Sequence, residues 1–285
     1  MRGVMKVALT IAGSDSSGGA GIQADIKTFQ AHGVYAMSVI TAVTVQNTQK
    51  VYDIQEIRPD IVKSQILCLF EDISINAVKI GMVSSAELIE TISETLIEVN
   101  APVVVVDPVM ISKSGYKLLK TEAKKALIKN LVTQAYVLTP NILEAELLSG
   151  DRIKNINDMK NTAKKIHEMG AKNVVLKGGH LDGNYSVDVL YDGYSFFEFS
   201  SPRIDTNNTH GTGCTFSSAI TANLALGKDL VSSIRFSKEY ITSAIAHSFP
   251  LGKGHGPVNH FYELYRRADF ISTPTPTLPH QGGGE

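Results

Sequence analysis

The strongest candidate for chemistry is a polar segment, residues 205–214, that ends in Gly211-Thr212-Gly213-Cys214 and runs directly into a long apolar helical pattern. The two glycines leave successive backbone N–H groups free to point at one spot, which predicts an anion-binding hole at the start of the helix. Cys214 falls in the first turn, where the helix dipole favours a thiolate. Such a residue could act as a base or a nucleophile. The alternative is a small side chain packed beneath the start of the helix.

A second glycine cluster, Gly13–Gly21, lies between an expected strand and an expected helix. Small residues there would let a ligand approach the backbone closely. The spacing Gly19-x-Gly21-x-x-Ala24 fits a relaxed dinucleotide fingerprint, but the acidic residue that should follow the second strand is missing, because Val45-Gln46-Asn47 stands in its place. Two interpretations stay open: a ligand-binding loop, or a tight turn in which Ser or Asp caps the helix.

Polar side chains also follow the expected strands. Asp107 comes after four consecutive valines, and Lys177 ends another apolar run, where it could reach a phosphate. Ligands collect at the carboxyl ends of the strands of an open parallel sheet. Asn141 and Glu144 are three residues apart at the start of a helical pattern, so that both face one way. With Asp107 they could hold Mg²⁺ through water, although each alone also suits a helix cap or a solvated first-turn carboxylate.

Composition and missing motifs exclude several classes of protein. With 27 basic and 28 acidic residues the net charge is −1, so there is no excess positive charge to hold a nucleic acid. No segment has the ~18 continuous apolar residues of a membrane span, and the N-terminus reads as a strand rather than a signal peptide. The chain has no P-loop motif and no His/Cys cluster with zinc-ligand spacing. Two cysteines suit a reducing cytosol, and we expect Cys68 to pack in an apolar helix face.

The elements that must position these residues alternate along the chain, which predicts βαβ units and a largely parallel sheet. The segment Ser186–Ile204 differs, because two alternating stretches are joined by Asp192-Gly193, a hairpin signal that predicts an antiparallel edge. No linker divides residues 1–270, so we expect one domain, and the Pro- and Gly-rich residues 271–285 are expected to form a disordered tail. The expected strands are 7–12, 36–45, 77–80, 103–106, 136–138 and 173–177, and the expected helices are 22–32, 61–70, 86–99, 118–132, 142–148, 159–169, 212–226 and 230–247.

Taken in order, these motifs resemble the ribokinase-like superfamily, and in particular the hydroxymethylpyrimidine and phosphomethylpyrimidine kinases of thiamine biosynthesis. The resemblance covers about residues 5–267 and implies a three-layer α/β/α fold with a central, mostly parallel sheet and an antiparallel edge. The segments that carry it are Ala12–Asp25, Thr44–Thr48, Lys79–Met82, Asp107–Met110, Thr139–Asn141, Glu144–Leu148, Lys177–His180, Gly211–Cys214 and Gly254–Val258.

The resemblance also implies a reaction. A hydroxymethyl oxygen of the substrate attacks the γ-phosphoryl group of ATP·Mg²⁺, the thiolate of Cys214 takes the hydroxyl proton, and a second phosphorylation gives the diphosphate. It further implies a small-molecule partner, a homodimer and a cytoplasmic location. The residues implied are Cys214, Lys177, Gly211 and Gly213 for catalysis, Asp25, Gln46, Met82, Val109 and Gly13 for the aminopyrimidine, Asn141, Glu144, Lys177 and Thr212 for ATP, and Asp107 and Glu144 for Mg²⁺.

Three alternatives stay open. A pyridoxal or pyridoxine kinase would share the fold and the anion hole, but pyridoxal-preferring relatives carry a cysteine where this chain has Met110, which favours the pyrimidine. A nicotinamide-dependent dehydrogenase would need the ribose-binding acid that is missing here. A binding module without activity would have no need of a base at the anion hole.

Overall fold

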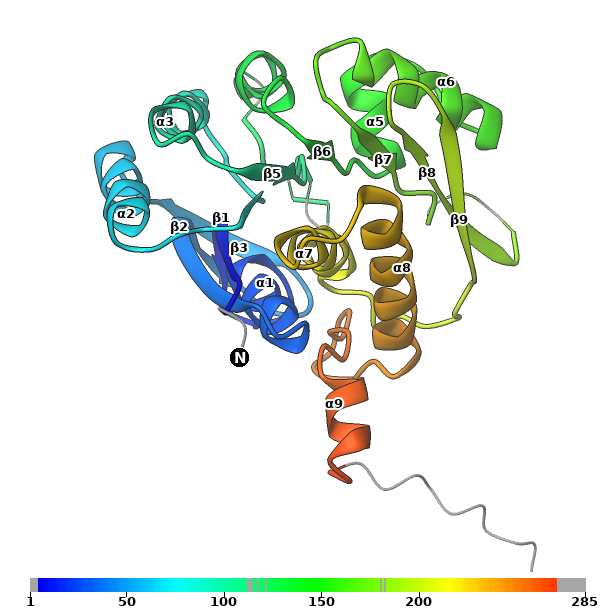
Figure 1. Cartoon of the computed structure of the whole chain (residues 1–285). Coiled ribbons are helices and arrows are strands. Elements are labelled where there is room, and N and C mark those ends of the chain that lie inside the picture. The colour runs from blue at the N-terminus through cyan, green and yellow to red at the C-terminus, as the bar shows by residue number, and fades with distance from the viewer. Residues whose placement is uncertain are drawn as a thin grey trace, which may run out of the picture.

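The computed structural model describes residues 5–111, 115–116, 118–120, 122–179, 181 and 183–270. A nine-stranded sheet runs through this part of the chain in the order β3-β2-β1-β4-β5-β6-β7-β8-β9 (Figure 1). The parallel strands are β1 (Val7–Asp15), β2 (Tyr35–Gln46), β4 (Ala77–Ile80), β5 (Val103–Val106), β6 (Val137–Leu138) and β7 (Val174–Leu176). The antiparallel strands are β8 (Tyr185–Tyr191) and β9 (Phe196–Pro202) at one edge and β3 (Val51–Glu56) at the other.

Helices cover both faces of the sheet, which confirms the expected three-layer architecture (Figure 1). One face carries α1 (Gly21–Ala31), α7 (Thr212–Ala225) and α8 (Leu230–Ala246). The other carries α2 (Pro59–Asp72), α3 (Ala86–Glu98), α4 (Ala123–Ala126) with the π-helical η1 (Leu127–Val132), α5 (Ile142–Ser149) and α6 (Ile156–His167). The short α9 (Tyr262–Arg267) follows α8 near the end of the described chain.

The four-valine strand β5 shows how the two faces are filled. Val104 and Val106 belong to the core under α2, α3 and α6, whereas Val105 packs on the other side with Phe216 and Ile220 of α7. Successive side chains of a strand point to opposite faces, and both faces here are covered, so every position is apolar. This packing holds the start of α7 against the carboxyl ends of the central strands.

Most expected elements are present, and the antiparallel edge is confirmed. In its hairpin turn Gly193 has φ 94°, and the Asp192 carboxylate accepts the N–H groups of Tyr194 and Ser195. The expected helix 118–132 was too long, because the helical residues are 123–132 and the last six are π-helical. The strand β3 and the helix α9 were not expected from the sequence. The expectation that Cys68 packs in an apolar helix face is wrong, because its side chain is exposed.

Some expectations concern residues outside the described ranges or stay predictions. The tail 271–285 and His180 of the Lys177–His180 motif lie outside the described residues. The single domain over residues 1–270 stays a prediction. Within the described ranges, no helix is both long enough and apolar enough to cross a membrane.

Candidate active site

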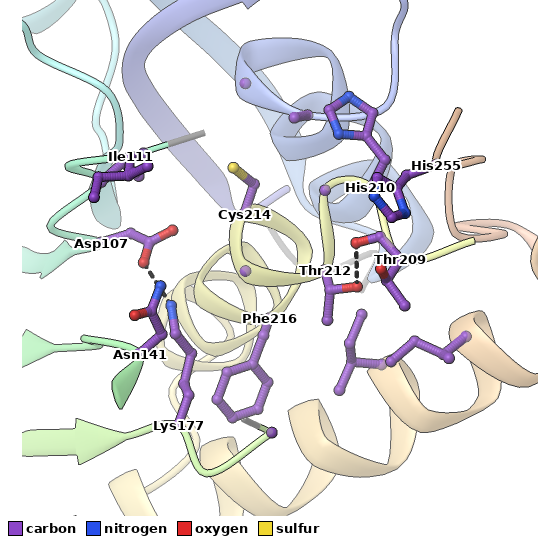
Figure 2. A pocket seen from close by; sticks show the side chains of 18 of the residues that line it. Asp107, Ile111, Asn141, Lys177, Thr209, His210, Thr212, Cys214, Phe216 and His255 are labelled. Atoms are coloured by element: carbon purple, nitrogen blue, oxygen red, sulfur yellow. Dashed lines mark hydrogen bonds and ion pairs between the residues drawn. The ribbon is translucent and has the colours of Figure 1, made fainter. Parts of the chain in front are cut away.

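A cavity of about 530 Å³ lies along the carboxyl ends of the parallel strands. At its centre, Asp107 follows β5, Lys177 follows β7 and Cys214 lies in the first turn of α7 (Figure 2). From this centre the lining continues toward β1 and β2 on one side and toward β8, β9 and α8 on the other. The site is therefore an elongated pocket with two ends and a charged middle.

The start of α7 has the geometry of the predicted anion hole. Gly211 is its N-cap with φ 79°, and a Cβ there would lie 1.7 Å from the carbonyl oxygen of Gly19, so only glycine is accommodated. The first helical hydrogen bond is donated by the Thr215 N–H to Gly211 O (2.9 Å). The N–H groups of Gly213 and Cys214 precede this bond and require partners outside the helix. They are therefore able to bind an anion.

A buried ion pair stands beside this helix start. Lys177 Nζ lies 2.8 Å from Asp107 Oδ1, and the Thr139 hydroxyl donates to the same oxygen (3.2 Å). Burial opposes ionisation of Asp107, but the charges of Lys177 and Lys79 hold its pKa below the usual value. Burial likewise lowers the pKa of Lys177, and the carboxylates Asp107 and Glu144 raise it above the usual value. Both partners are therefore charged.

Asn141 and Glu144 form a reciprocal cap at the start of α5. Asn141 Oδ1 accepts the Glu144 N–H (2.9 Å), and Glu144 Oε2 accepts the Asn141 N–H (2.8 Å). Asn141 is thus a helix cap, but Glu144 is buried rather than solvated. Burial raises the pKa of Glu144 to about 7; Lys177 opposes this rise and Asp107 adds to it.

This oxygen-rich group fits Mg²⁺. Asp107 and Glu144 supply two carboxylates and Asn141 an amide, and all three line the cavity. Hard oxygen donors suit Mg²⁺, which is held in proteins by one or two carboxylates with water and substrate phosphates. Burial, and to a smaller extent the charge of Asp107, raises the pKa of Glu144, and a cation bound beside it would favour the charged carboxylate.

The predicted thiolate form of Cys214 is not what the structure favours. Its side chain lines the cavity, and its sulfur accepts the backbone N–H of Gly21 at the start of α1. Burial raises the pKa of the thiol to about 11, against the charge of Lys79 and with the help of Asp25 and Asp107. The expectation of a thiolate in the free protein is therefore wrong at neutral pH, because desolvation outweighs the helix N-terminus.

At the end near β1 and β2, the structure brings together four of the five residues predicted to bind the pyrimidine. Gly13, Gln46, Met82 and Val109 all line the cavity. A Cβ at Gly13 would lie 2.6 Å from Met82 Cε, so this glycine makes room for the methionine. The end thus combines apolar walls with one amide side chain.

Asp25 does not belong to this group, and its predicted contact with substrate is wrong. Its carboxylate is 0% exposed and forms an ion pair with Lys79 (2.9 Å). The hydroxyls of Thr10 and Ser218 donate to it as well, each at 2.6 Å. Its oxygens are therefore occupied and sealed from the cavity.

The glycine loop of residues 13–21 is folded around the carboxylate of Asp15. This carboxylate accepts the N–H groups of Ser17 (2.9 Å), Gly19 (3.1 Å) and Ala20 (2.8 Å), and His210 Nε2 lies 2.8 Å away. The N–H groups that a dinucleotide would need are thus used within the protein. The expected side-chain cap is absent, because the N-cap of α1 is Ala20, with no capping hydrogen bond from a side chain. Gly13, Ala20 and Gly21 line the cavity, so the loop is part of the pocket wall.

The other end of the cavity was missed by sequence reasoning. It is lined by Phe216, Ile241 and Ile245, which look in the sequence like ordinary core positions of two helices. A buried ion pair, Lys238 Nζ to Asp188 Oδ2 at 2.8 Å, also lies there. An apolar slot of this kind suits a nucleobase. Thr212, predicted to bind the nucleotide, lines the cavity between this end and the centre, and its hydroxyl donates to Thr209 O (2.8 Å).

The three-layer fold and the glycine-capped helix facing a Lys–Asp pair define a phosphotransferase of the ribokinase-like class. The chain belongs to the phosphomethylpyrimidine kinase family, whose model matches residues 15–259. It is 50% identical over 249 residues to the hydroxymethylpyrimidine/phosphomethylpyrimidine kinase of Aquifex aeolicus, covering 87% of this chain and 98% of that relative. The resemblance found in the motifs is therefore confirmed.

Two solved structures show the same similarity. A phosphomethylpyrimidine kinase from Clostridium difficile is 53% identical with a TM-score of 0.76, covering 84% of this chain and 99% of that one. An ADP complex of Bacillus subtilis pyridoxal kinase is 44% identical with a TM-score of 0.85, covering 90% and 98%. The chain is thus similar in sequence and fold to a pyridoxal kinase as well.

The Asp15–His210 contact yields a prediction for stability. Burial raises the pKa of Asp15, but the hydrogen bonds from His210 and Ser17 outweigh it and lower the pKa to about 2. A carboxylate with a depressed pKa stabilises the fold above its unfolded pKa, and this contribution disappears as the pH falls toward the folded value. We expect Asp15→Asn to lower the free energy of unfolding by about 2 kcal/mol at neutral pH and by progressively less below about pH 4.

Urea unfolding followed across this pH range measures the effect, with the exposed Asp205→Asn as the control for loss of one charge. A difference between wild type and Asp15→Asn that stays constant as the pH falls would contradict the assignment.

Proposed function

We propose that the protein is an ATP-dependent kinase that phosphorylates 4-amino-5-hydroxymethyl-2-methylpyrimidine and then its monophosphate, for thiamine biosynthesis. The observation that carries the proposal is that the Lys177–Asp107 pair and the first N–H groups of α7 line the same part of the cavity. On one side of them lies the apolar slot at Phe216 and Ile241, and on the other side lies the end that contains the amide of Gln46. Family membership supports the same activity, because the Aquifex aeolicus relative carries the name of both phosphorylations.

The end of the cavity near β1 and β2, here called the acceptor end, suits an aminopyrimidine alcohol. The amide of Gln46 can both donate to a ring nitrogen and accept from an exocyclic amine. Met82 and Val109 supply apolar walls for the ring. With the ring held there, the hydroxymethyl oxygen would point toward Cys214 and the start of α7.

Phosphoryl transfer through a loose transition state needs positioning and charge stabilisation more than covalent help. The substrate oxygen forms a bond to the γ-phosphorus, the bond to the β,γ-bridging oxygen breaks, and ADP leaves. Lys177 and the N–H groups of Gly213 and Cys214 stabilise the charge on the transferring group. Asp107, Glu144 and Asn141 would hold Mg²⁺, which supplies charge neutralisation at the phosphates. The thiolate form of Cys214 accepts the hydroxyl proton.

We expect the two phosphorylations to depend to different degrees on Cys214. Because the pKa of its thiol is about 11, the thiolate fraction at neutral pH is small and rises about tenfold per pH unit. We expect kcat/KM for the alcohol to rise with pH in the wild type and to lose this rise in Cys214→Ala. The monophosphate acceptor is already an anion and has no hydroxyl proton to lose at these pH values, so its phosphorylation should fall much less in Cys214→Ala. Product masses over time give both rates, and an equal loss in the two steps would refute the base role.

Glu144 predicts how Mg²⁺ binding responds to pH. Its pKa of about 7 means that it is partly protonated at neutral pH, and a bound dication requires the carboxylate. We expect Mg²⁺ binding to release a fraction of a proton near neutral pH and to strengthen as the pH rises through 7. Calorimetry in buffers of different ionisation enthalpy measures the released protons. Glu144→Gln should bind Mg²⁺ more weakly with no proton release, whereas unchanged release would contradict the assignment.

A second candidate is a pyridoxal or pyridoxine kinase, which the similarity to the Bacillus subtilis pyridoxal kinase favours. In this chain a buried thioether, Met110, stands where pyridoxal-preferring relatives carry a thiol, and a thioether cannot trap an aldehyde. The test is incubation with ATP and Mg²⁺ and either the pyrimidine alcohol or pyridoxine, followed by mass spectrometry. A pyrimidine monophosphate followed by a diphosphate supports the proposal, and phosphorylated pyridoxine alone would transfer the protein to the vitamin B6 reaction.

A homodimer in the cytoplasm is part of the proposal. Both cysteines are free, as in a reducing compartment. Val43 and Val45 of β2 and Tyr52 of β3 are exposed apolar side chains beside the unpaired edge of the sheet, which favours association there. We expect the mass in solution to be that of two chains and Val43→Glu to halve it, while the control Ile97→Glu on α3 leaves it unchanged. A monomeric wild type would refute the dimer.

A further inference from the structure

Asp25 and Lys79 form an ion pair that the reaction above does not use. Lys79 Nζ lies 3.0 Å from Asp25 Oδ1 and 2.9 Å from Oδ2, and both side chains are 0% exposed. Isolated buried charges are unfavourable, and a buried pair is often no more stabilising than apolar residues of the same size. Stability alone therefore does not account for these two charges.

The pair joins the elements that surround Cys214. Asp25 belongs to α1 and Lys79 to β4, while Thr10 of β1 and Ser218 of α7 donate their hydroxyls to the Asp25 carboxylate. A Cβ at Gly81 would lie 2.6 Å from Lys79 Nζ, so this glycine leaves the room that the ammonium occupies. Four elements thus meet at one carboxylate.

The helical spacing places this meeting point one turn along α1 and α7 from the sulfur. Ser218 follows Cys214 by four residues on α7, and Asp25 follows Gly21 by four residues on α1. Residues four apart lie on one face of a helix, about 6 Å apart along the axis. Gly21 donates its N–H to the Cys214 sulfur, just as Ser218 donates its hydroxyl to Asp25. One turn above the ion pair, therefore, the same two helices hold the thiol.

Charged side chains from four segments of the chain act on the Cys214 sulfur. Lys79 on β4 favours a thiolate, whereas Asp25 on α1 and Asp107 after β5 disfavour it. Lys177 after β7 also interacts with Cys214. Asp25 and Lys79 are thus opposite charges at nearly the same place. Removing either one leaves the effect of the other on the sulfur uncompensated.

We propose that Asp25 and Lys79 are positioning residues of the phosphotransfer site, which fix the first turns of α1 and α7 around Cys214 and set how readily its sulfur reacts. Their effect on catalysis rests on the proposed function of Cys214, but their effect on the thiol does not. The two can therefore be tested separately.

The experiment measures alkylation of Cys214 by iodoacetamide at one mildly alkaline pH, by mass spectrometry, in a Cys68→Ser background that removes the other thiol. Cys68 is exposed on α2, away from the cavity lining. The variants are Asp25→Asn, Lys79→Met and the charge-neutral double Asp25→Asn/Lys79→Met. Kinase rates for the pyrimidine alcohol are measured on the same proteins.

We expect alkylation about three- to tenfold faster in Asp25→Asn, the change that half to one pKa unit produces, slower by a similar factor in Lys79→Met, and near the starting rate in the double variant. Lys79→Met buries a lone carboxylate; if it does not fold, Asp25→Asn compared with the double variant carries the test. Opposite signs support the proposal, because loosened packing alone would change the single variants in the same direction. Rates that are unchanged, or changed in one direction, overturn it. Opposite signs with unchanged kinase rates support the proposal and refute the base role of Cys214 instead.

Discussion

Charges that are removed from water must be paired, and this constraint organises the site. Three acidic side chains lie buried around the start of α7, and each has its own cationic or donor partner: Asp107 with Lys177, Asp25 with Lys79 and Asp15 with His210. A lone buried charge is strongly unfavourable. Each pair joins two separate elements, so the helix start is held in place from three directions. Lys177 is thus charged and fixed before any phosphate arrives.

Close backbone contact is the second condition for this arrangement. Gly211 lies against Gly19, so the loop before α1 and the loop before α7 touch through their main chains. Any Cβ at Gly211 would collide with a carbonyl oxygen. The contact brings Asp15 within reach of His210 and the Gly21 N–H within reach of the Cys214 sulfur. The end of the cavity near β1 and β2 and the start of α7 are consequently parts of one continuous surface.

Local patterns in the sequence predicted much of this protein. Val103–Val106 predicted a strand covered on both faces, Asp192-Gly193 a hairpin, and Gly211–Cys214 the start of a helix. The motif order identified the family. The strand β3 escaped notice because only two of its six residues are strongly apolar, and it is stabilised by pairing with β2 rather than by its own pattern. The apolar slot at Phe216 and Ile241 escaped because its residues have ordinary helical spacing.

The sequence by itself determined most of the strands and helices, the positions of the glycines and the set of polar residues at the ends of the strands, since these depend on local periodicity and backbone freedom. Only the tertiary structure decided which polar groups face the cavity and in what charge state. Asp25 and Gln46 look equally suited to a substrate in the sequence, yet one is sealed against Lys79 and the other lines the pocket. Cys214 likewise has a helix start that favours a thiolate, but its burial keeps it protonated. Desolvation depends on all neighbouring elements at once, and no local pattern contains that information.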